Sequence, residues 1–180
     1  MKKFGRQNLI FALSGSITLL ILLLGTTTYL NAVNYAEIAR GVDVYLVTDS
    51  QTTNVGDTFT ADIFITNDKT PLNAMEAEVF FDSTLFEVSD FTFGTSLCED
   101  RFILDTIIDN NFGRIHMSCG TITPFTGNAT VFGTITATPL KQGVTNLTFG
   151  EKTHVHIHDG LGTEISRDTY STAISIEAEV

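Results

Sequence analysis

The sequence predicts an all-β protein, a nine-stranded jelly-roll β-sandwich preceded by one transmembrane α-helix. Two observations predict this class. Beyond residue 36, apolar and polar residues alternate with a period of two between short breaks rich in Gly and Asn, which is typical of half-buried strands joined by turns. Residues 9–30 carry no charged side chain, and about 20 apolar residues are enough for a helix to cross a bilayer.

The alternation assigns an inward and an outward face to each expected strand. Residues 58–65 and 74–81 place these side chains inward: Phe59, Ala61, Ile63, Ile65, Met75, Ala77, Val79 and Phe81. Residues 114–119, 130–137 and 170–176 repeat the pattern. The outward positions include both glutamates of 74–81 and three aromatic residues, Phe64, Phe80 and Phe132. Turn-forming residues at 54–57, 110–113, 141–143 and 158–160 separate the strands.

The N-terminal region predicts how the chain meets a membrane. Lys2, Lys3 and Arg6 are the only charges before Glu37. By the positive-inside rule, residues 1–8 are then cytoplasmic and 9–30 form a transmembrane helix or signal anchor. Residues 31–41 are a linker, and 42–180 form an extracytoplasmic domain of a single-pass cell-membrane protein. A cleaved signal peptide is the alternative, and it also places the domain outside.

The charge balance limits the classes of partner. The net charge is −11, and all acidic residues follow position 36. A nucleic-acid partner is excluded because phosphate binding requires a basic surface. No phosphate-binding glycine loop and no catalytic motif of the HExxH or GxSxG kind occurs, so we expect no enzyme.

Two cysteines, Cys98 and Cys119, flank an expected hairpin whose turn is near Asn110. An antiparallel return brings Cys119 toward the loop that holds Cys98, and an oxidising compartment favours a structural disulfide. Two unpaired thiols or a metal-binding pair remain as alternatives.

Metal binding is predicted most directly by a run of alternating histidines. On a strand, His154, His156 and His158 would project to one side, and Asp159 could add an oxygen ligand. A solvent-facing strand with no metal is the simpler interpretation. Aspartates in several turns would suit calcium, so calcium and zinc are the two cofactors the patterns allow.

Several motifs resemble the cohesin family. Val55-Gly56-Asp57 opens a strand, Leu72-Asn73-Ala74 starts one that ends at Asp82, and residues 133–140 with 147–149 resemble the later strands. The resemblance covers about residues 42–177. It implies a jelly-roll sandwich, of the broader fold shared with carbohydrate-binding modules, that holds dockerin-bearing proteins in polysaccharide-degrading assemblies.

The resemblance also implies a partner-binding face on the sheet that contains residues 74–81, 102–109 and 113–119. Its candidate residues are Glu76, Glu78, Phe80, Arg114 and His116. Our first hypothesis is therefore a non-catalytic, surface-displayed module that recognises a dockerin-like protein. The alternatives are a carbohydrate-binding module that takes polysaccharide on the same fold, and a metal-binding extracytoplasmic domain.

Overall fold

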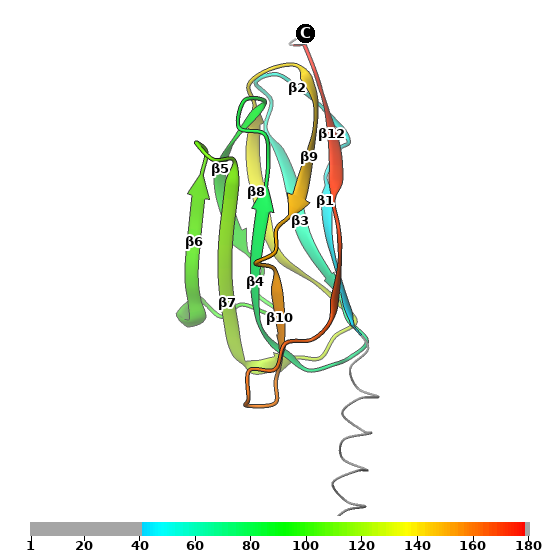
Figure 1. Ribbon diagram of the computed structural model, residues 1–180, viewed down its shortest axis with the longest axis vertical. Helices are drawn as coiled ribbons and strands as arrows, with labels where there is room; N and C mark the ends of the chain where they lie inside the picture. The colour runs from blue at the N-terminus through cyan, green and yellow to red at the C-terminus, as the bar shows by residue number, and fades with distance from the viewer. Residues whose placement is uncertain (1–40, 179–180) are drawn as a thin grey trace, which may run out of the picture. The chain divides into compact units, whose positions relative to one another are not determined.

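The computed structural model describes residues 41–178, which form twelve β-strands and one short 3-10 turn (Figure 1). In chain order they are β1 (Val42–Thr48), β2 (Thr52–Asn54), β3 (Phe59–Thr66), β4 (Leu72–Phe80), β5 (Phe86–Phe93), η1 (Asp100–Phe102), β6 (Ile103–Asp109), β7 (Arg114–Phe125), β8 (Ala129–Pro139), β9 (Gly143–Phe149), β10 (His154–Ile157), β11 (Arg167–Tyr170) and β12 (Thr172–Glu177).

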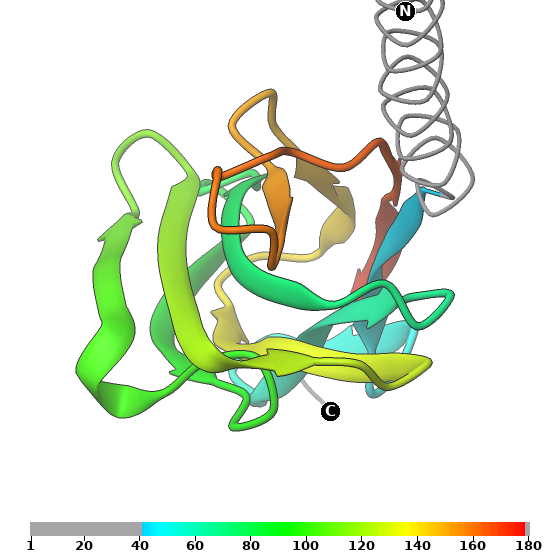
Figure 2. The same cartoon turned by 90° about the horizontal axis from the view of Figure 1, so that it is seen from below.

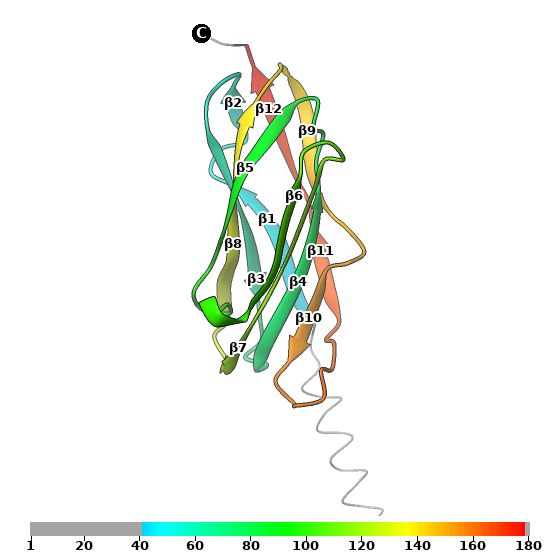
Figure 3. The same ribbon diagram turned by 90° about the vertical axis from the view of Figure 1, so that its left-hand side faces the viewer.

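The strands form two sheets that face each other (Figure 3). One sheet has five strands in the order β11-β1-β3-β8-β5. The other has seven, in the order β2-β12-β9-β4-β7-β6, with β10 also paired to β4. The pairs β1–β11 and β12–β2 are parallel, and all the other pairs are antiparallel. The predicted all-β sandwich is confirmed.

The core lies between the sheets and is built from the residues that the alternation placed inward. In β3, the four inward side chains are at most 3% exposed, and in β4 Met75, Ala77 and Val79 are fully buried. Phe86 of β5 stacks against Phe81 and meets Phe59 edge to face. Because each of these aromatic side chains buries a large apolar area, they contribute strongly to the stability of the sandwich.

The predicted count of nine strands is too low for the described residues. Three of the twelve strands, β2, β10 and β11, have only three or four residues, which is too short for a clear alternation. Residues 170–176 were expected as one strand, but the chain changes sheets at Ser171. As a result, β11 pairs with β1 whereas β12 pairs with β9.

The prediction that Phe132 points outward is wrong. Phe64 pairs with Val131 and Ile63 with Gly133, so Phe132 is an extra residue in a β-bulge of β8. One inserted residue reverses the inward and outward faces of a strand. Phe132 is consequently fully buried, and its ring packs edge to face on Phe93.

The predicted disulfide is confirmed. Cys98 and Cys119 are bonded, with their Cα atoms 5.4 Å apart. Cys98 lies in the segment between β5 and η1, and Cys119 lies in β7, where it is the register partner of Ile103 in β6. The bond therefore ties the approach to β6 onto the neighbouring strand.

Within residues 41–178, no helix is long and apolar enough to cross a membrane. The predicted transmembrane helix, residues 9–30, and its flanking segments 1–8 and 31–40 lie outside the described residues.

Candidate functional site

Four of the five candidate partner-binding residues lie together on the outer face of the seven-stranded sheet. β4 and β7 pair so that Glu78 is opposite His116 and Phe80 is opposite Arg114. On the other side of β7, the edge strand β6 places Ile107 opposite His116 and Asp109 opposite Arg114. In Figure 1, β4, β7 and β6 run side by side toward the edge of the sheet. We call this surface the β4–β7–β6 face.

A polar triad crosses the middle of the β4–β7–β6 face. His116 Nε2 lies 2.6 Å from a carboxylate oxygen of Glu76 on β4, and His116 Nδ1 lies 3.5 Å from a carboxylate oxygen of Asp105 on β6. Both ring nitrogens thus face a carboxylate. The triad links the three strands across this face.

Glu78 departs from the prediction because it is buried, with only 6% of its surface exposed. The segment that connects β9 to β10 passes over it: Gly150 N–H donates to the Glu78 carbonyl oxygen, and Thr153 Oγ1 accepts from the Glu78 N–H. A Cβ on residue 150 would overlap the Glu78 carboxylate, so the glycine allows this close passage. Glu78 is therefore not a surface contact. Its carboxylate lies 3.7 Å from the Arg114 guanidinium.

Exposed apolar side chains gather on and around the β4–β7–β6 face, and the sequence interpretation missed most of them. Leu104 and Ile107 of β6 are 74% and 43% exposed, Phe112 at the β6–β7 turn is 83% exposed, and Phe80 is 40% exposed. A signal was present in the run Ile103-Leu104-Asp105-Thr106-Ile107-Ile108. Its apolar residues do not alternate, because Leu104 is an extra residue in a β-bulge between Ile103, which pairs with Cys119, and Asp105, which pairs with Ser118.

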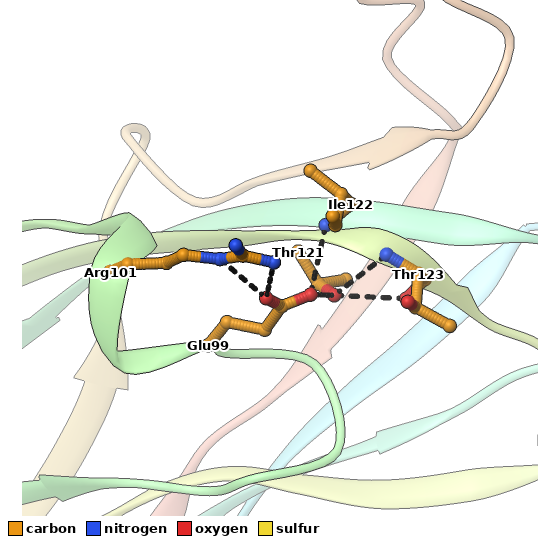
Figure 4. A network of polar contacts seen from close by, with 5 residues as sticks. All are labelled: Glu99, Arg101, Thr121, Ile122 and Thr123. Carbon is orange, nitrogen blue, oxygen red and sulfur yellow. Dashed lines mark hydrogen bonds and ion pairs between the residues drawn. The ribbon is translucent and has the colours of Figure 1, made fainter.

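The base of the β6–β7 hairpin carries a network of hydrogen bonds around Glu99 (Figure 4). One carboxylate oxygen of Glu99 accepts from Thr121 Oγ1 at 2.6 Å and from the Ile122 N–H at 3.1 Å. The other oxygen accepts two bonds from the Arg101 guanidinium, at 2.8 and 2.9 Å. These hydrogen bonds lower the Glu99 pKa from 4.5 to about 2, and the bond from Thr121 has the largest effect, followed by those from Arg101. The network, next to the disulfide, anchors η1 to the end of β7.

The histidine run does not continue along one strand as predicted. β10 ends at Ile157, so His158 lies beyond it. His154 and His156 remain on the strand, where their Nδ1 atoms contact a Glu164 carboxylate oxygen at 2.8 Å and the Gly162 carbonyl oxygen at 3.2 Å. The Asp159 carboxylate accepts hydrogen bonds from the Leu161 N–H and from Thr163 Oγ1. These bonds lower the pKa of Asp159, and the bond from Thr163 has the largest effect.

These contacts give the histidine segment a structural role. Among residues 41–178, no group of three or more His, Cys, Asp or Glu side chains is placed to hold a metal ion. A zinc or calcium site remains a prediction from the sequence.

The outer face of the five-stranded sheet has a different chemistry. Threonines and carboxylates dominate it, and Tyr45 stacks on Tyr170 with ring centroids 4.5 Å apart and planes 10° from parallel. Tyr45 and Tyr170 are register partners on neighbouring strands, and each ring covers one face of the other. The stacking reduces the aromatic surface that is open to a sugar.

The comparisons with known proteins agree with this architecture. The model of the cohesin domain family matches residues 44–176, nearly the whole described domain. The chain belongs to the cohesin family. It is thus a member of a family of non-catalytic protein-binding modules. A search of the curated proteins found no match.

Solved cohesin structures share the fold at low sequence identity. The seventh type I cohesin of ScaB from Pseudobacteroides cellulosolvens has a TM-score of 0.66 and 17% identity, covering 78% of this chain and 94% of its own. The cohesin of a cohesin–dockerin complex from Clostridium thermocellum has a TM-score of 0.64 and 16% identity, covering 77% and 94%. The cohesin module of a Clostridium perfringens family 33 glycoside hydrolase has a TM-score of 0.64 and 14% identity, covering 77% and 98%.

Proposed function

We propose that this cohesin domain binds a dockerin-like protein partner through the β4–β7–β6 face and performs no catalysis itself. The observation that carries the proposal is the composition of this face. It combines exposed apolar side chains, Ile107 and Phe80 among them, with the polar triad of Glu76, His116 and Asp105. Apolar anchors beside charged groups are typical of specific protein–protein interfaces. Several of the similar cohesin structures were solved in complex with a dockerin.

The proposal includes the place where the module works. With residues 9–30 as a membrane anchor and residues 1–8 in the cytoplasm, the domain would be displayed outside the cell membrane. The bound dockerin-like protein would then be held at the cell surface. A link to polysaccharide degradation is part of the same proposal and rests on the family resemblance alone.

Carbohydrate binding by the same fold has less physical support. A polysaccharide platform needs aromatic faces open to solvent. Tyr45 and Tyr170 stack on each other, so one face of each ring is already occupied. We therefore favour a protein partner.

A pair of matched substitutions tests the proposed face. Ile107 on β6 and Val47 on β1 are exposed apolar residues, 43% and 50%, on the outer faces of opposite sheets. We expect Ile107→Asp to weaken binding of a dockerin by about tenfold or more, because a charge is introduced into an apolar contact. Val47→Asp should leave binding unchanged. The full-length chain in detergent is measured by biolayer interferometry against a panel of purified dockerins.

Two results would contradict the proposal. One is that no dockerin in the panel binds the full-length chain while its thermal unfolding shows a folded domain. The other is that Val47→Asp and Ile107→Asp weaken binding equally, which would move the contact away from the β4–β7–β6 face.

A further inference from the structure

The tip of the β6–β7 hairpin displays Phe112 to solvent. The side chain is 83% exposed, although it is one of the largest apolar side chains available. A single exposed apolar residue is common on protein surfaces and by itself indicates nothing. What distinguishes Phe112 is the structure that holds it in place.

Three sets of hydrogen bonds fix the backbone around Phe112. The Asp109 carboxylate accepts from the N–H groups of Asn111 and Phe112, both at 3.1 Å. The side-chain amide of Asn110 makes two hydrogen bonds to Val88 in the other sheet. Its oxygen accepts from the Val88 N–H and its nitrogen donates to the Val88 carbonyl oxygen, at 2.9 Å each. Gly113 has a φ of 64°, which favours glycine, and its carbonyl oxygen accepts from Phe81 N–H at 2.8 Å. The aromatic ring is therefore presented on a turn that loses little entropy on binding.

A hollow of about 400 Å³ opens at the base of this ring. It is lined by Phe80, Asp109, Phe112 and Arg114, so two aromatic side chains and one guanidinium face the same space. The hollow is continuous with the β4–β7–β6 face, because Phe80 and Arg114 are register partners there.

Arg114 has unused hydrogen-bonding capacity in this hollow. A guanidinium has five N–H donors. Within residues 41–178, the buried Nε of Arg114 has no hydrogen-bond partner, and the Nη1 atom is 3.7 Å from Glu78, which is too far for a hydrogen bond. One oxygen of Asp109 is already engaged by the turn. Arg114 is ion-paired with Glu78 but not hydrogen-bonded to it, and an incoming carboxylate would give the guanidinium a charge-assisted acceptor at hydrogen-bond distance.

We propose that Phe112 and the adjacent hollow form the specificity site of this cohesin domain, and that it selects a partner segment carrying a large apolar side chain next to a carboxylate. The apolar side chain enters the hollow between Phe80 and Phe112, and the carboxylate pairs with Arg114. This inference deepens the proposed function, since it names the chemistry of the partner on the same face.

The test uses a random peptide library displayed on phage and selected on the full-length chain. We expect enriched peptides to carry a large apolar residue within a few positions of Asp or Glu. Phe112→Ala and Arg114→Gln should each weaken the binding of a synthetic enriched peptide by about tenfold. Leu161→Ala is the matched control, because Leu161 is 85% exposed at a different loop and should not contribute. Thermal unfolding of each variant checks that it is folded.

The outcomes separate this inference from the proposed function. Enrichment of basic or purely polar peptides, no enrichment at all, or equal binding by folded Phe112→Ala and wild type would each overturn the specificity site. If dockerins bind and respond to Ile107→Asp but not to Phe112→Ala or Arg114→Gln, the proposed function holds and this inference is wrong. If acidic–apolar peptides bind as described while no dockerin does, the inference holds and the dockerin proposal is wrong.

Discussion

The two ends of the β6–β7 hairpin are both fastened to the rest of the sandwich, but by different chemistry. At the base, the Cys98–Cys119 bond and the Glu99 carboxylate attach the approach to β6 onto β7. At the tip, the neutral amide of Asn110 reaches Val88 in the opposite sheet. The base therefore depends on redox state and pH, whereas the cross-sheet bonds of Asn110 at the tip depend on neither.

This difference matters because β6 is an edge strand. Among the strands of residues 41–178 it pairs with β7 alone, and the view from below in Figure 2 shows it at the outer margin of its sheet. An edge strand with exposed apolar residues such as Leu104 is prone to fray or to pair with other chains. Fastening both of its ends keeps the proposed binding face in one shape.

The largest effect is expected at the base, from removal of the disulfide. The double variant Cys98→Ala/Cys119→Ala should lower the free energy of unfolding by about 3 kcal/mol, because the open chain gains conformational entropy when unfolded. Thermal unfolding of the full-length protein, followed by circular dichroism, measures the change. Ser96→Ala is the control, an exposed residue of the same loop. An unchanged unfolding midpoint in the double variant would mean that the base is held without the covalent bond.

A smaller effect is expected at the tip. Asn110→Ala removes two hydrogen bonds and leaves the Val88 N–H and carbonyl groups without their partner, which should cost about 1–3 kcal/mol. Amide hydrogen exchange at Val88 should rise together with the loss of stability. Asn111→Ala is the matched control, because the exposed neighbouring asparagine contributes only its backbone N–H to the turn. Equal effects of the two variants would show that the cross-sheet amide does not fasten the tip.

The same contrast explains which features the sequence could predict. The disulfide was predictable because hairpin geometry brings two distant cysteines together, and only two cysteines exist. The sandwich was predictable because alternation marks long strands such as β3, all of whose apolar residues but the outward Phe64 are buried. Asn110 was recognised only as a turn former, since nothing local in the sequence indicates that its amide meets Val88 in the opposite sheet.

Two errors share a physical cause. Phe132 was placed outward and Glu78 was placed on the surface, both by strict alternation. A bulge reversed the faces of β8 at Phe132, and the segment through Gly150 covered Glu78. Bulges and covering segments depend on tertiary contacts, which period-two patterns do not contain. The resemblance placed β4, β7 and β6 in one sheet, which the structure confirms, whereas the exposed apolar residues on β6 and at Phe112 required the structure.

The smallest effect is expected from acidification of the base. The pKa of Glu99 is lowered from 4.5 in the unfolded chain to about 2 in the folded one. The folded state therefore binds the proton less readily, and the contribution of Glu99 to stability is present above pH 4.5 and is lost as the pH falls toward 2. The unfolding midpoint of wild type and of Glu99→Gln should differ at pH 6 and converge toward pH 2.

The remaining carboxylates titrate in both proteins, so the difference between the two midpoints isolates Glu99. The disulfide is intact in both proteins and does not change with acid. A pH-dependent difference between the two midpoints therefore reports on Glu99 and not on the disulfide. A difference that stays constant down to pH 2 would mean that the Glu99 carboxylate is not held by Thr121 and Arg101. The base of the hairpin would then be held by the covalent bond, which acid does not change.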